Sequence, residues 1–363
     1  KHGIKLVLGY TVEGFKEKDN GVEVLLKDNP SLQADMVVLA IGVTPDTVLA
    51  KEAGLELGIK ESIVVNDRME TSVPDIYAAG DAVQVKHYVT GNDALISLAG
   101  PANKQGRIIA DNICGGDSRY LGSQGSSVIK VFDMTAATTG INETNAKKSG
   151  LEVDTVILSP MSHAGYYPGG KVMTMKVVFE KETYRLLGAQ IIGYEGVDKR
   201  IDVLATAIHA GLKATQLKDL DLAYAPPYSS AKDPVNMAGF MIDNIAKGTL
   251  KQWHLEDMDK ISKDKSAVLL DVRTVDEFSR GHMDGFKNIP VDELRERINE
   301  IEKGKPVYLI CQSGLRSYIA SRILEGNGYE TYNFSGGFRF YDAVVNDRAL
   351  IERAYACGMD YKK

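Results

Sequence analysis

The segment that most restricts the fold of this chain is a short apolar run that delivers a cysteine to a polar loop. Residues 307–310 are apolar or aromatic, Cys311 follows, and residues 312–317 are mostly polar and include a glycine and an arginine. A segment with the apolar spacing of a helix then begins at once. A strand that runs directly into a helix in this way is typical of an α/β domain with a parallel sheet.

The loop after Cys311 has the features of an anion-binding site. Successive backbone N–H groups in such a loop can converge, and the N-terminus of the next helix adds partial positive charge. Both effects favour a thiolate over a thiol, so we expect Cys311 to be an accessible nucleophile. Arg316 would close the loop with a fixed cation. A buried strand-end cysteine without chemistry is the alternative, and the glycine, the arginine and the abrupt change to a helix disfavour it.

Four motifs in order identify the last part of the chain as similar to a rhodanese domain: residues 270–278, 281–290, 311–316 and 335–338. This resemblance implies that Cys311 accepts a sulfane sulfur and becomes a persulfide. Tyrosine phosphatases have a related loop with five residues between cysteine and arginine. Here there are four, which disfavours a phosphatase. Asp271 and Arg273 could orient the loop, although an ordinary structural ion pair is an equally open reading.

A second set of motifs resembles the FAD-binding segment of the two-dinucleotide disulfide reductases. Small residues follow an expected buried strand at residues 75–81, and residues 40–46 form the companion motif. The resemblance implies that Asp81 holds the flavin ribityl chain, with Thr71 and Gly80 beside it. It also implies that the helix beginning near Ala99 directs its N-terminus at the flavin pyrimidine, where the helix dipole stabilises negative charge on reduced flavin.

Residues 163–170 and 223–236 resemble the dimerisation domain of coenzyme A-disulfide reductases, including the form fused to a rhodanese domain and described as a persulfide reductase. In such enzymes the dimerisation domain of one subunit completes the active site of its partner, which implies a homodimer. Tyr224 matches a flavin-contacting tyrosine. Lys232 matches a cation that meets coenzyme A phosphates, and Asn103 falls at a substrate-contacting position.

Three further tyrosines in these motifs are candidates for phenols near the reacting sulfur. Tyr166 is assigned to substrate binding, and Tyr167 and Tyr228 to a catalytic role as donors of a proton or hydrogen bond. For each tyrosine alone, packing at the subunit interface is equally open. The 17 tyrosines in the chain leave many for packing.

The chain divides into three expected domains. Residues 1–123 would hold the end of an NAD(P)-binding domain and the second part of an FAD-binding domain, with strands at 4–8, 36–42 and 75–81 and a helix at 95–113. Residues 124–248 would form an α+β dimerisation domain, and residues 249–363 an α/β rhodanese domain. The overall class is therefore α/β, with remnants of Rossmann-like domains at the start.

Elements that a disulfide reductase of this type needs are missing from the chain. It has no Gly-rich loop for FAD, no redox cysteine some forty residues after such a loop, and no second Gly-rich loop for NAD(P)H. It also begins with Lys1 rather than Met, so we expect the C-terminal portion of a longer enzyme, without flavin-dependent activity by itself. We interpret Cys114 as structural and Cys357 as incidental.

Composition excludes several classes of function. The 43 basic and 49 acidic side chains give a net charge of −6, which disfavours a nucleic-acid-binding protein. No apolar run approaches the ~18 residues of a membrane span. The 3 cysteines are too few and too scattered for a disulfide framework or a cysteine-rich metal site. A reducing compartment, the cytoplasm, fits best.

These observations lead to one main hypothesis and two alternatives. The main hypothesis is an FAD- and NAD(P)H-dependent reductase of coenzyme A disulfide or persulfide, coupled to sulfur transfer through a Cys311 persulfide. The first alternative is a relative of the NADH oxidases and peroxidases. The second is a stand-alone persulfide carrier or sulfurtransferase built on a dimer scaffold.

Overall fold

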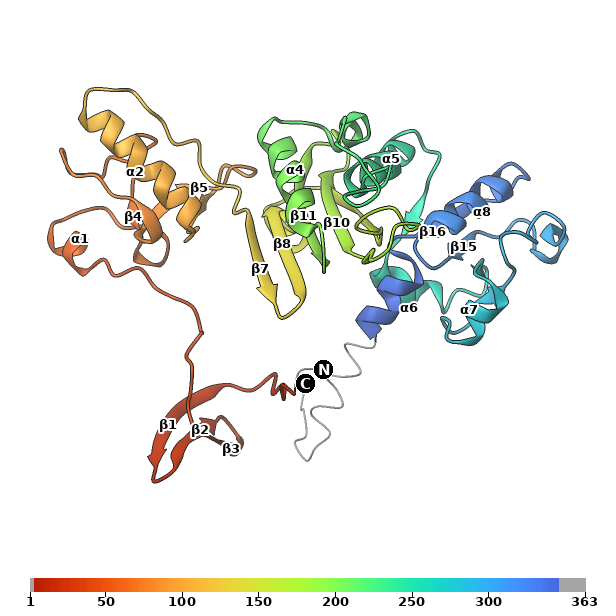
Figure 1. Ribbon diagram of the computed structural model, residues 1–363, viewed down its shortest axis with the longest axis horizontal. Coiled ribbons are helices and arrows are strands. Elements are labelled where there is room, and N and C mark those ends of the chain that lie inside the picture. Colours follow the sequence, from red (N-terminus) through yellow and green to blue (C-terminus); the bar gives the residue numbers. More distant parts are fainter. Residues whose placement is uncertain (1–2, 346–363) are drawn as a thin grey trace. The chain divides into compact units, whose positions relative to one another are not determined.

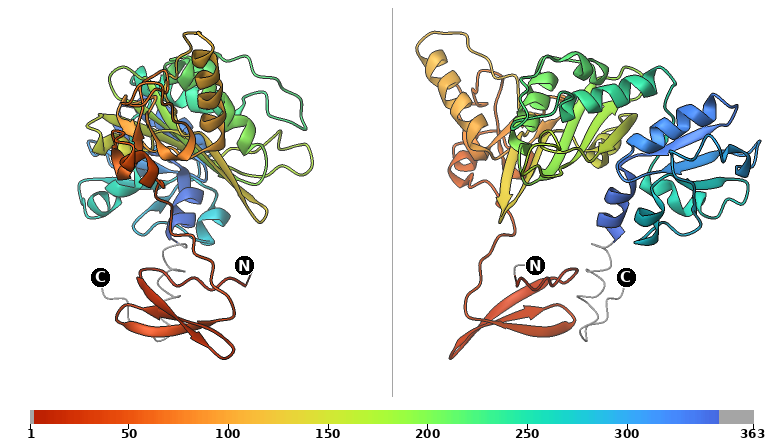
Figure 2. Two further views of the ribbon diagram at one scale, coloured as in Figure 1. Left: turned by 90° about the vertical axis from the view of Figure 1, so that its left-hand side faces the viewer. Right: turned by 45° about the vertical axis from the view of Figure 1, so that its right-hand side comes forward.

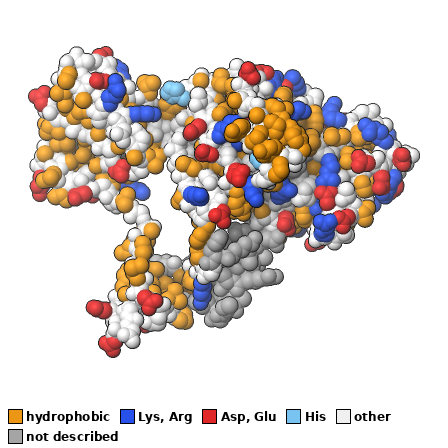
Figure 3. Space-filling model, viewed as in Figure 1, with side chains coloured by type: hydrophobic (Ala, Val, Ile, Leu, Met, Phe, Trp, Pro, Cys, Tyr) orange, Lys and Arg blue, Asp and Glu red, His pale blue; other side chains and the backbone are white. Residues whose placement is uncertain are grey.

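A computed structural model describes residues 3–345 of the chain (Figure 1). The described residues form two compact units, one of residues 3–43 and 341–345 and the other of Thr44–Phe340. Figure 3 shows acidic and basic side chains intermixed over the face that it presents. Among the described residues, no helix has the length and apolar character needed to cross a bilayer.

The first unit contains an antiparallel meander of β1 (Val12–Lys18), β2 (Gly21–Leu26) and β3 (Asn29–Ala34). The buried strand predicted at residues 36–42 is wrong, as is the strand at 4–8, because both segments lie outside the strands and Ile41 is 89% exposed. No strand in the described chain pairs with either segment, and an apolar run without a hydrogen-bonded neighbour does not form a sheet.

Residues 44–123 form one long helix, a small three-stranded sheet and short helical turns. The elements are α1 (Val48–Glu52), η1 (Ile59–Glu61), β4 (Ile63–Val64), η2 (Gly80–Ala82), β5 (Val83–Lys86), β6 (Asp93–Ala94) and α2 (Ala99–Ile113). Helix α2 confirms the predicted helix. The strand predicted at 75–81 is wrong, because Asp75 adopts φ +63° in a turn and only Tyr77 makes an isolated bridge, to Glu70. The true strand, β5, begins after Ala82.

An antiparallel five-stranded sheet follows, with the strand order β7-β8-β11-β10-β9. Its strands are β7 (Ser127–Val131), β8 (Met134–Gly140), β9 (Val153–Leu158), β10 (Thr174–Glu180) and β11 (Leu186–Gly193), and its helical segments are α3 (Glu143–Lys148), α4 (Val197–His209), η3 (Ala214–Asp219) and α5 (Pro234–Ala246). Helices α4 and α5 pack against one face of this sheet (Figure 2). This arrangement confirms the expected α+β domain.

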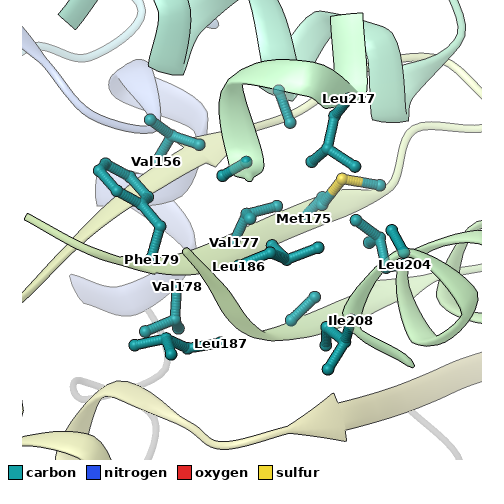
Figure 4. Packing of buried hydrophobic residues seen from close by; sticks show 14 of the residues in the cluster. Val156, Met175, Val177, Val178, Phe179, Leu186, Leu187, Leu204, Ile208 and Leu217 are labelled. Atoms are coloured by element: carbon teal, nitrogen blue, oxygen red, sulfur yellow. The ribbon is translucent and has the colours of Figure 1, made fainter. Parts of the chain in front are cut away.

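The interior of this domain consists of strand side chains that alternate toward the helices. Met175, Val177, Leu204 and Leu217 are fully buried and point into one cluster (Figure 4). Asp233 begins α5 by accepting the backbone N–H of Val235, and a proline occupies the first turn, where its missing N–H costs nothing. The sequence therefore fixes where the helix that covers the sheet begins.

The remaining elements form a parallel sheet with the order β12-β16-β15-β13-β14. They are β12 (Gln252–Trp253), η4 (Leu255–Asp257), α6 (Met258–Ile261), β13 (Val268–Asp271), α7 (Val275–Ser279), β14 (Lys287–Asn288), η5 (Ile298–Glu300), β15 (Val307–Ile310), α8 (Leu315–Glu325) and β16 (Thr331–Phe334). The α/β class is confirmed. Strand β15 lies in the middle of this sheet, so its carboxyl end, where Cys311 begins, has a neighbouring strand on each side.

The packing of α5 against η3 can be tested with two glycines, one in α5 and a control in α2. A Cβ at Gly239 would collide with the backbone of Leu217 and Lys218 in η3, whereas a Cβ at Gly106 would meet nothing within 4 Å. We expect Gly239→Ala to lower the free energy of unfolding by about 1–3 kcal/mol through overpacking. Gly106→Ala should raise it by about 0.5–1 kcal/mol through helix propensity. Urea denaturation measures both, and a neutral or stabilised Gly239→Ala variant would contradict the close contact of α5 with η3.

Candidate functional site

The cysteine loop surrounds a buried sulfur. Cys311 follows the central strand β15, and Gly314 adopts φ +99° immediately before α8. In this conformation the Gly314 N–H donates to Cys311 Sγ at 3.1 Å, and the Ser317 hydroxyl donates to it at 3.2 Å. Cys311 is only 1% exposed, so the expected accessibility is wrong: the loop folds around the sulfur instead of presenting it. Two donors therefore converge on the sulfur.

The loop is held by the next strand and the segment after it. The Asn333 side-chain amide donates to the Gly314 carbonyl at 3.1 Å, and the Phe338 N–H donates to the Cys311 carbonyl at 2.8 Å. Gly337 adopts φ +68°, and a Cβ there would lie 2.7 Å from the Ser313 backbone. A glycine is therefore required at this position, which explains the Gly-Gly of the fourth rhodanese-like motif.

A carboxylate binds the Arg316 guanidinium. This guanidinium makes a bidentate pair with Glu277 of α7, with Nη1–Oε2 and Nη2–Oε1 distances of 2.7 Å each. The Arg316 hydrogen bonds are the main reason that the pKa of Glu277 falls from 4.5 to about 2. A depressed pKa means that the pair contributes stability above about pH 4.5 and loses it as the pH falls through about 2. The fixed cation expected at Arg316 is therefore paired with Glu277, and its part in the sulfur chemistry stays a prediction.

Asp271 and Arg273 form a buried structural ion pair. Arg273 is 1% exposed, and it donates to both carboxylate oxygens of Asp271 and to the Gly281 carbonyl. Its guanidinium also lies 3.8 Å from the ring centroid of Phe338, whose N–H binds the Cys311 carbonyl. Of the two readings left open by the sequence, the structural one describes these contacts, and Phe338 connects the pair with the cysteine loop.

The expected flavin residues gather at the N-terminus of α2. Gly80 has φ +86°, and its N–H donates to Gln105 Oε1 at 2.7 Å, which fixes the turn against the helix. Asp81 is exposed in this turn. The helix begins at Ala99 after Leu98, which has no side-chain oxygen for the first-turn N–H groups. An exposed carboxylate beside an uncapped helix N-terminus fits the hydroxyl and pyrimidine groups of a flavin. The Thr71 hydroxyl does not bond to this turn. It donates instead to the Val73 carbonyl.

Two other residues on α2 are exposed. Asn103 donates its side-chain amide to the Ala99 carbonyl one turn earlier. Cys114 is the C-cap residue, and its exposure does not fit the structural role that we expected. Cys357 lies outside the described residues. No group of three or more potential metal ligands occurs within residues 3–345.

The four expected tyrosines make different contacts. The Tyr166 and Tyr224 hydroxyls are hydrogen-bonded at 2.8 Å, which raises the pKa of Tyr224. Tyr167 packs its ring edge-on against His163, with the centroids 5.6 Å apart. Tyr228 is 72% exposed and, with Tyr224, lines a cavity of about 470 Å³.

Lys232 lies on a different cavity. This cavity has a volume of about 400 Å³, and its lining includes Phe240 of α5 together with Ser313, Gly314 and Leu315. Lys232 therefore lines a different cavity from Tyr224 and Tyr228, one that it shares with residues of the cysteine loop.

A buried arginine that the sequence analysis missed organises the tyrosine cavity. Arg200 of α4 is 1% exposed and donates to Asp233 Oδ2 at 2.9 Å and to the Ser162 carbonyl at 2.9 Å. It also donates to the Ser229 hydroxyl at 3.2 Å. The network ties the segment before α5 to the segment before β10. Nothing in the local pattern around Arg200 signals this, because its partners are distant in sequence.

Glu277 and Ser317 were also missed as parts of the cysteine site. Glu277 could have been noticed from Thr274-x-x-Glu277, a capping-box pattern that the structure shows at the start of α7. That pattern indicates a helix start, however, and not the pair with Arg316. Ser317 stands next to Arg316 in the motif, where only the loop conformation reveals that its hydroxyl meets the sulfur.

Comparison with known families matches most of the chain. Residues 1–106 match the pyridine nucleotide-disulphide oxidoreductase model, and residues 126–234 match the dimerisation domain of the same family. Residues 254–343 match the rhodanese-like domain, which includes Cys311, Arg316 and Glu277.

Relatives with related names share up to two thirds of the chain. The "NAD(P)H sulfur oxidoreductase (CoA-dependent)" of Pyrococcus abyssi is 37% identical over 65% of this chain and 52% of its own length. The "Coenzyme A disulfide reductase" of Staphylococcus aureus strain RF122 is 35% identical over 61% of this chain and 50% of its own. The chain thus spans about half the length of the curated relatives that it matches.

Two solved structures resemble nearly the whole chain. Reduced Bacillus anthracis CoADR-RHD is 46% identical, with a TM-score of 0.89, over 93% of this chain and 60% of its own. A NAD-dependent persulfide reductase from A. fulgidus is 40% identical, with a TM-score of 0.82, over 92% of this chain and 61% of its own. The chain therefore belongs to the pyridine nucleotide-disulphide oxidoreductases and carries a rhodanese-like domain after their dimerisation domain.

Proposed function

We propose that this chain supplies the sulfur-transfer site and part of the flavin and substrate sites of an enzyme that reduces coenzyme A disulfide or persulfide with FAD and NAD(P)H. The observation that carries the proposal is the sulfur of Cys311, which receives hydrogen bonds from Gly314 and Ser317 at the start of α8. The names of the relatives from P. abyssi and S. aureus support the substrate class. Residues 1–123, 124–248 and 249–363 are the corresponding proposed domains.

The chemistry at Cys311 is the transfer of one sulfur atom. The thiolate attacks the terminal sulfur of a persulfide anion R–S–S⁻, a new S–S bond forms, and the S–S bond of the donor breaks to release R–S⁻. Cys311 then carries the persulfide, and the total charge is unchanged. The same Gly314 N–H and Ser317 O–H, which lie at 3.1 and 3.2 Å from Sγ, would help to hold the negative charge during the transfer.

The flavin half of the proposal rests on the turn before α2. Asp81 would accept hydrogen bonds from the flavin ribityl hydroxyls, Gly80 would allow the close approach of the backbone, and the N–H groups at Ala99 would face the pyrimidine. Bound FAD supplies the transfer of electrons from NAD(P)H to a disulfide. The chain's own contribution is to orient the isoalloxazine and to place the positive end of α2 where charge develops.

Substrate contacts are proposed for the residues that the family resemblance implies. In a homodimer, Tyr224 and Tyr166 of one subunit would meet flavin and substrate as a hydrogen-bonded pair. Tyr167 and Tyr228 would provide further phenols near the reacting sulfur, and Asn103 would contact the substrate. Lys232 would attract coenzyme A phosphates on the side of its cavity that faces the cysteine loop.

A flavin oxidase is the second candidate, because the relative from Methanocaldococcus jannaschii that is named NADH oxidase is 35% identical over 66% of this chain. The buried, hydrogen-bonded Cys311 favours a sulfur substrate over oxygen. Turnover that requires coenzyme A would separate the two functions.

Replacing the nucleophile tests sulfur transfer directly. Cys311→Ala should reduce persulfide-dependent sulfur transfer by at least about 10³-fold, because it removes the proposed nucleophile. Flavin absorbance should not change, and Cys114→Ala, which removes an exposed cysteine elsewhere, should retain full activity. Wild-type rates of sulfur transfer in Cys311→Ala would overturn the assignment.

Removing the charge of Lys232 tests the proposed phosphate contact. Lys232→Gln should raise KM for coenzyme A substrates about tenfold, which corresponds to about 1.4 kcal/mol of a charge-assisted contact. KM for a persulfide without phosphates should not change. Lys247→Gln, at the far end of α5 and paired with Asp243, is the matched control. Equal effects on both substrates would show that Lys232 is not a phosphate contact.

A further inference from the structure

The sequence places a cation, Arg316, in the cysteine loop. In the structure its positive charge is offset by an ion pair with Glu277. Both terminal nitrogens of Arg316 are bound by the two oxygens of Glu277. The pair is partly accessible, with side-chain exposures of 30% and 29%. Arg316 therefore stands beside the loop with its positive charge offset by a carboxylate in direct contact.

Glu277 is fixed in this position by a second set of contacts. Its Oε2 also accepts the backbone N–H and the hydroxyl of Thr274, each at 3.0 Å. The capping box at the start of α7 thus holds the carboxylate in place independently of Arg316. Glu277 is consequently a permanent part of the loop's surroundings and not a mobile surface acid.

The groups that touch the sulfur carry no net charge. They are the N–H of Gly314 and the hydroxyl of Ser317. The buried Arg273 has its own carboxylate partner, Asp271. Lys232 lines the same cavity as Ser313 and Gly314, and Glu277 is not among the residues that line it.

We propose that Glu277 is a specificity-determining residue that makes the Cys311 site discriminate against dianionic sulfur donors and accept singly charged alkyl persulfides. The proposal rests on the sulfur-transfer function proposed above and names the substrate class of that site. A carboxylate bound to the loop arginine opposes negative charge on the transferred sulfur and its leaving group, and it also withholds Arg316 from those atoms. Both effects grow with the charge carried there, and not with charge on distant parts of the donor.

The two donor classes differ by one charge in balanced reactions at the same sulfur. With thiosulfate, the Cys311 thiolate attacks the outer sulfur, the S–S bond of thiosulfate breaks, and sulfite leaves with two negative charges. With an alkyl persulfide anion, the leaving thiolate carries one. In each case Cys311 ends as a persulfide anion, and no oxidant or reductant is consumed. The additional charge of thiosulfate and sulfite is what the carboxylate opposes.

The test compares thiosulfate with the persulfide of 2-mercaptoethanol as donors to the full chain. Glu277→Gln keeps a side chain that completes a capping box while removing the charge. We expect kcat/KM for thiosulfate to rise about tenfold and that for the alkyl persulfide to change less than about threefold. The rise should shrink as ionic strength increases from 20 to 200 mM, because exposed charges are screened over that range.

Two control variants separate this role from a structural one. Glu293→Gln removes a carboxylate from another ion pair of the same domain, with Arg297, and should leave the donor ratio unchanged. Thr274→Ala removes half of the capping box but keeps the pair with Arg316 and should also leave it unchanged. If Glu277→Gln does not fold, Glu277→Asp, which keeps the charge but shortens its reach to Arg316, should give an intermediate ratio.

The outcomes distinguish failure of this inference from failure of the proposed function. Wild-type protein that transfers sulfur from neither donor would contradict the sulfur-transfer function itself. An active wild type whose donor ratio is unchanged in both Glu277 variants would refute the specificity role alone. An equal loss of activity with both donors would show that Glu277 only supports the fold.

Discussion

The conformation of Gly314 determines whether the cysteine loop exists. At φ +99° its N–H points to the Cys311 sulfur while its carbonyl accepts the Asn333 amide. A residue with a Cβ would be strained in this conformation, which glycine adopts at no steric cost. Through this one peptide, the strand that ends at Ile310, the helix that begins at Leu315 and the neighbouring strand become parts of a single site. The chemistry proposed for Cys311 depends on that arrangement more than on any one charge.

Two buried ion pairs, in different domains, each connect segments that are distant in the chain. Arg200 and Asp233 tie the segment before α5 to distant backbone, and Arg273 and Asp271 tie the end of β13 to the segments at Gly281 and Phe338. In both cases the guanidinium also donates to backbone carbonyls, which satisfies donors that would otherwise be costly to bury. The pairs therefore hold irregular segments where neither strand nor helix hydrogen bonds can.

The sequence predicted those parts of the fold that are specified locally. The strand, loop and helix around Cys311 are continuous in the chain, and the start of α5 is encoded by Asp233 and the proline after it. Residues 36–42 show the limit of such reasoning, because an apolar run becomes a strand only when another strand is available to pair with it. In the site, Glu277 and Arg316 are 39 residues apart in sequence, and no local pattern connects a capping residue with a loop arginine.

The environment of the single tryptophan has a spectroscopic consequence. Trp253 is 2% exposed, its ring centroid lies 4.4 Å from that of Phe334, and its indole N–H donates to the Leu309 carbonyl two residues before Cys311. Phe334 in turn follows Asn333, which holds Gly314. The tryptophan fluorescence of this chain therefore reports on one place, the strands that support the cysteine loop. Loading of the sulfur could be followed there without any label, against a background to which no other indole contributes.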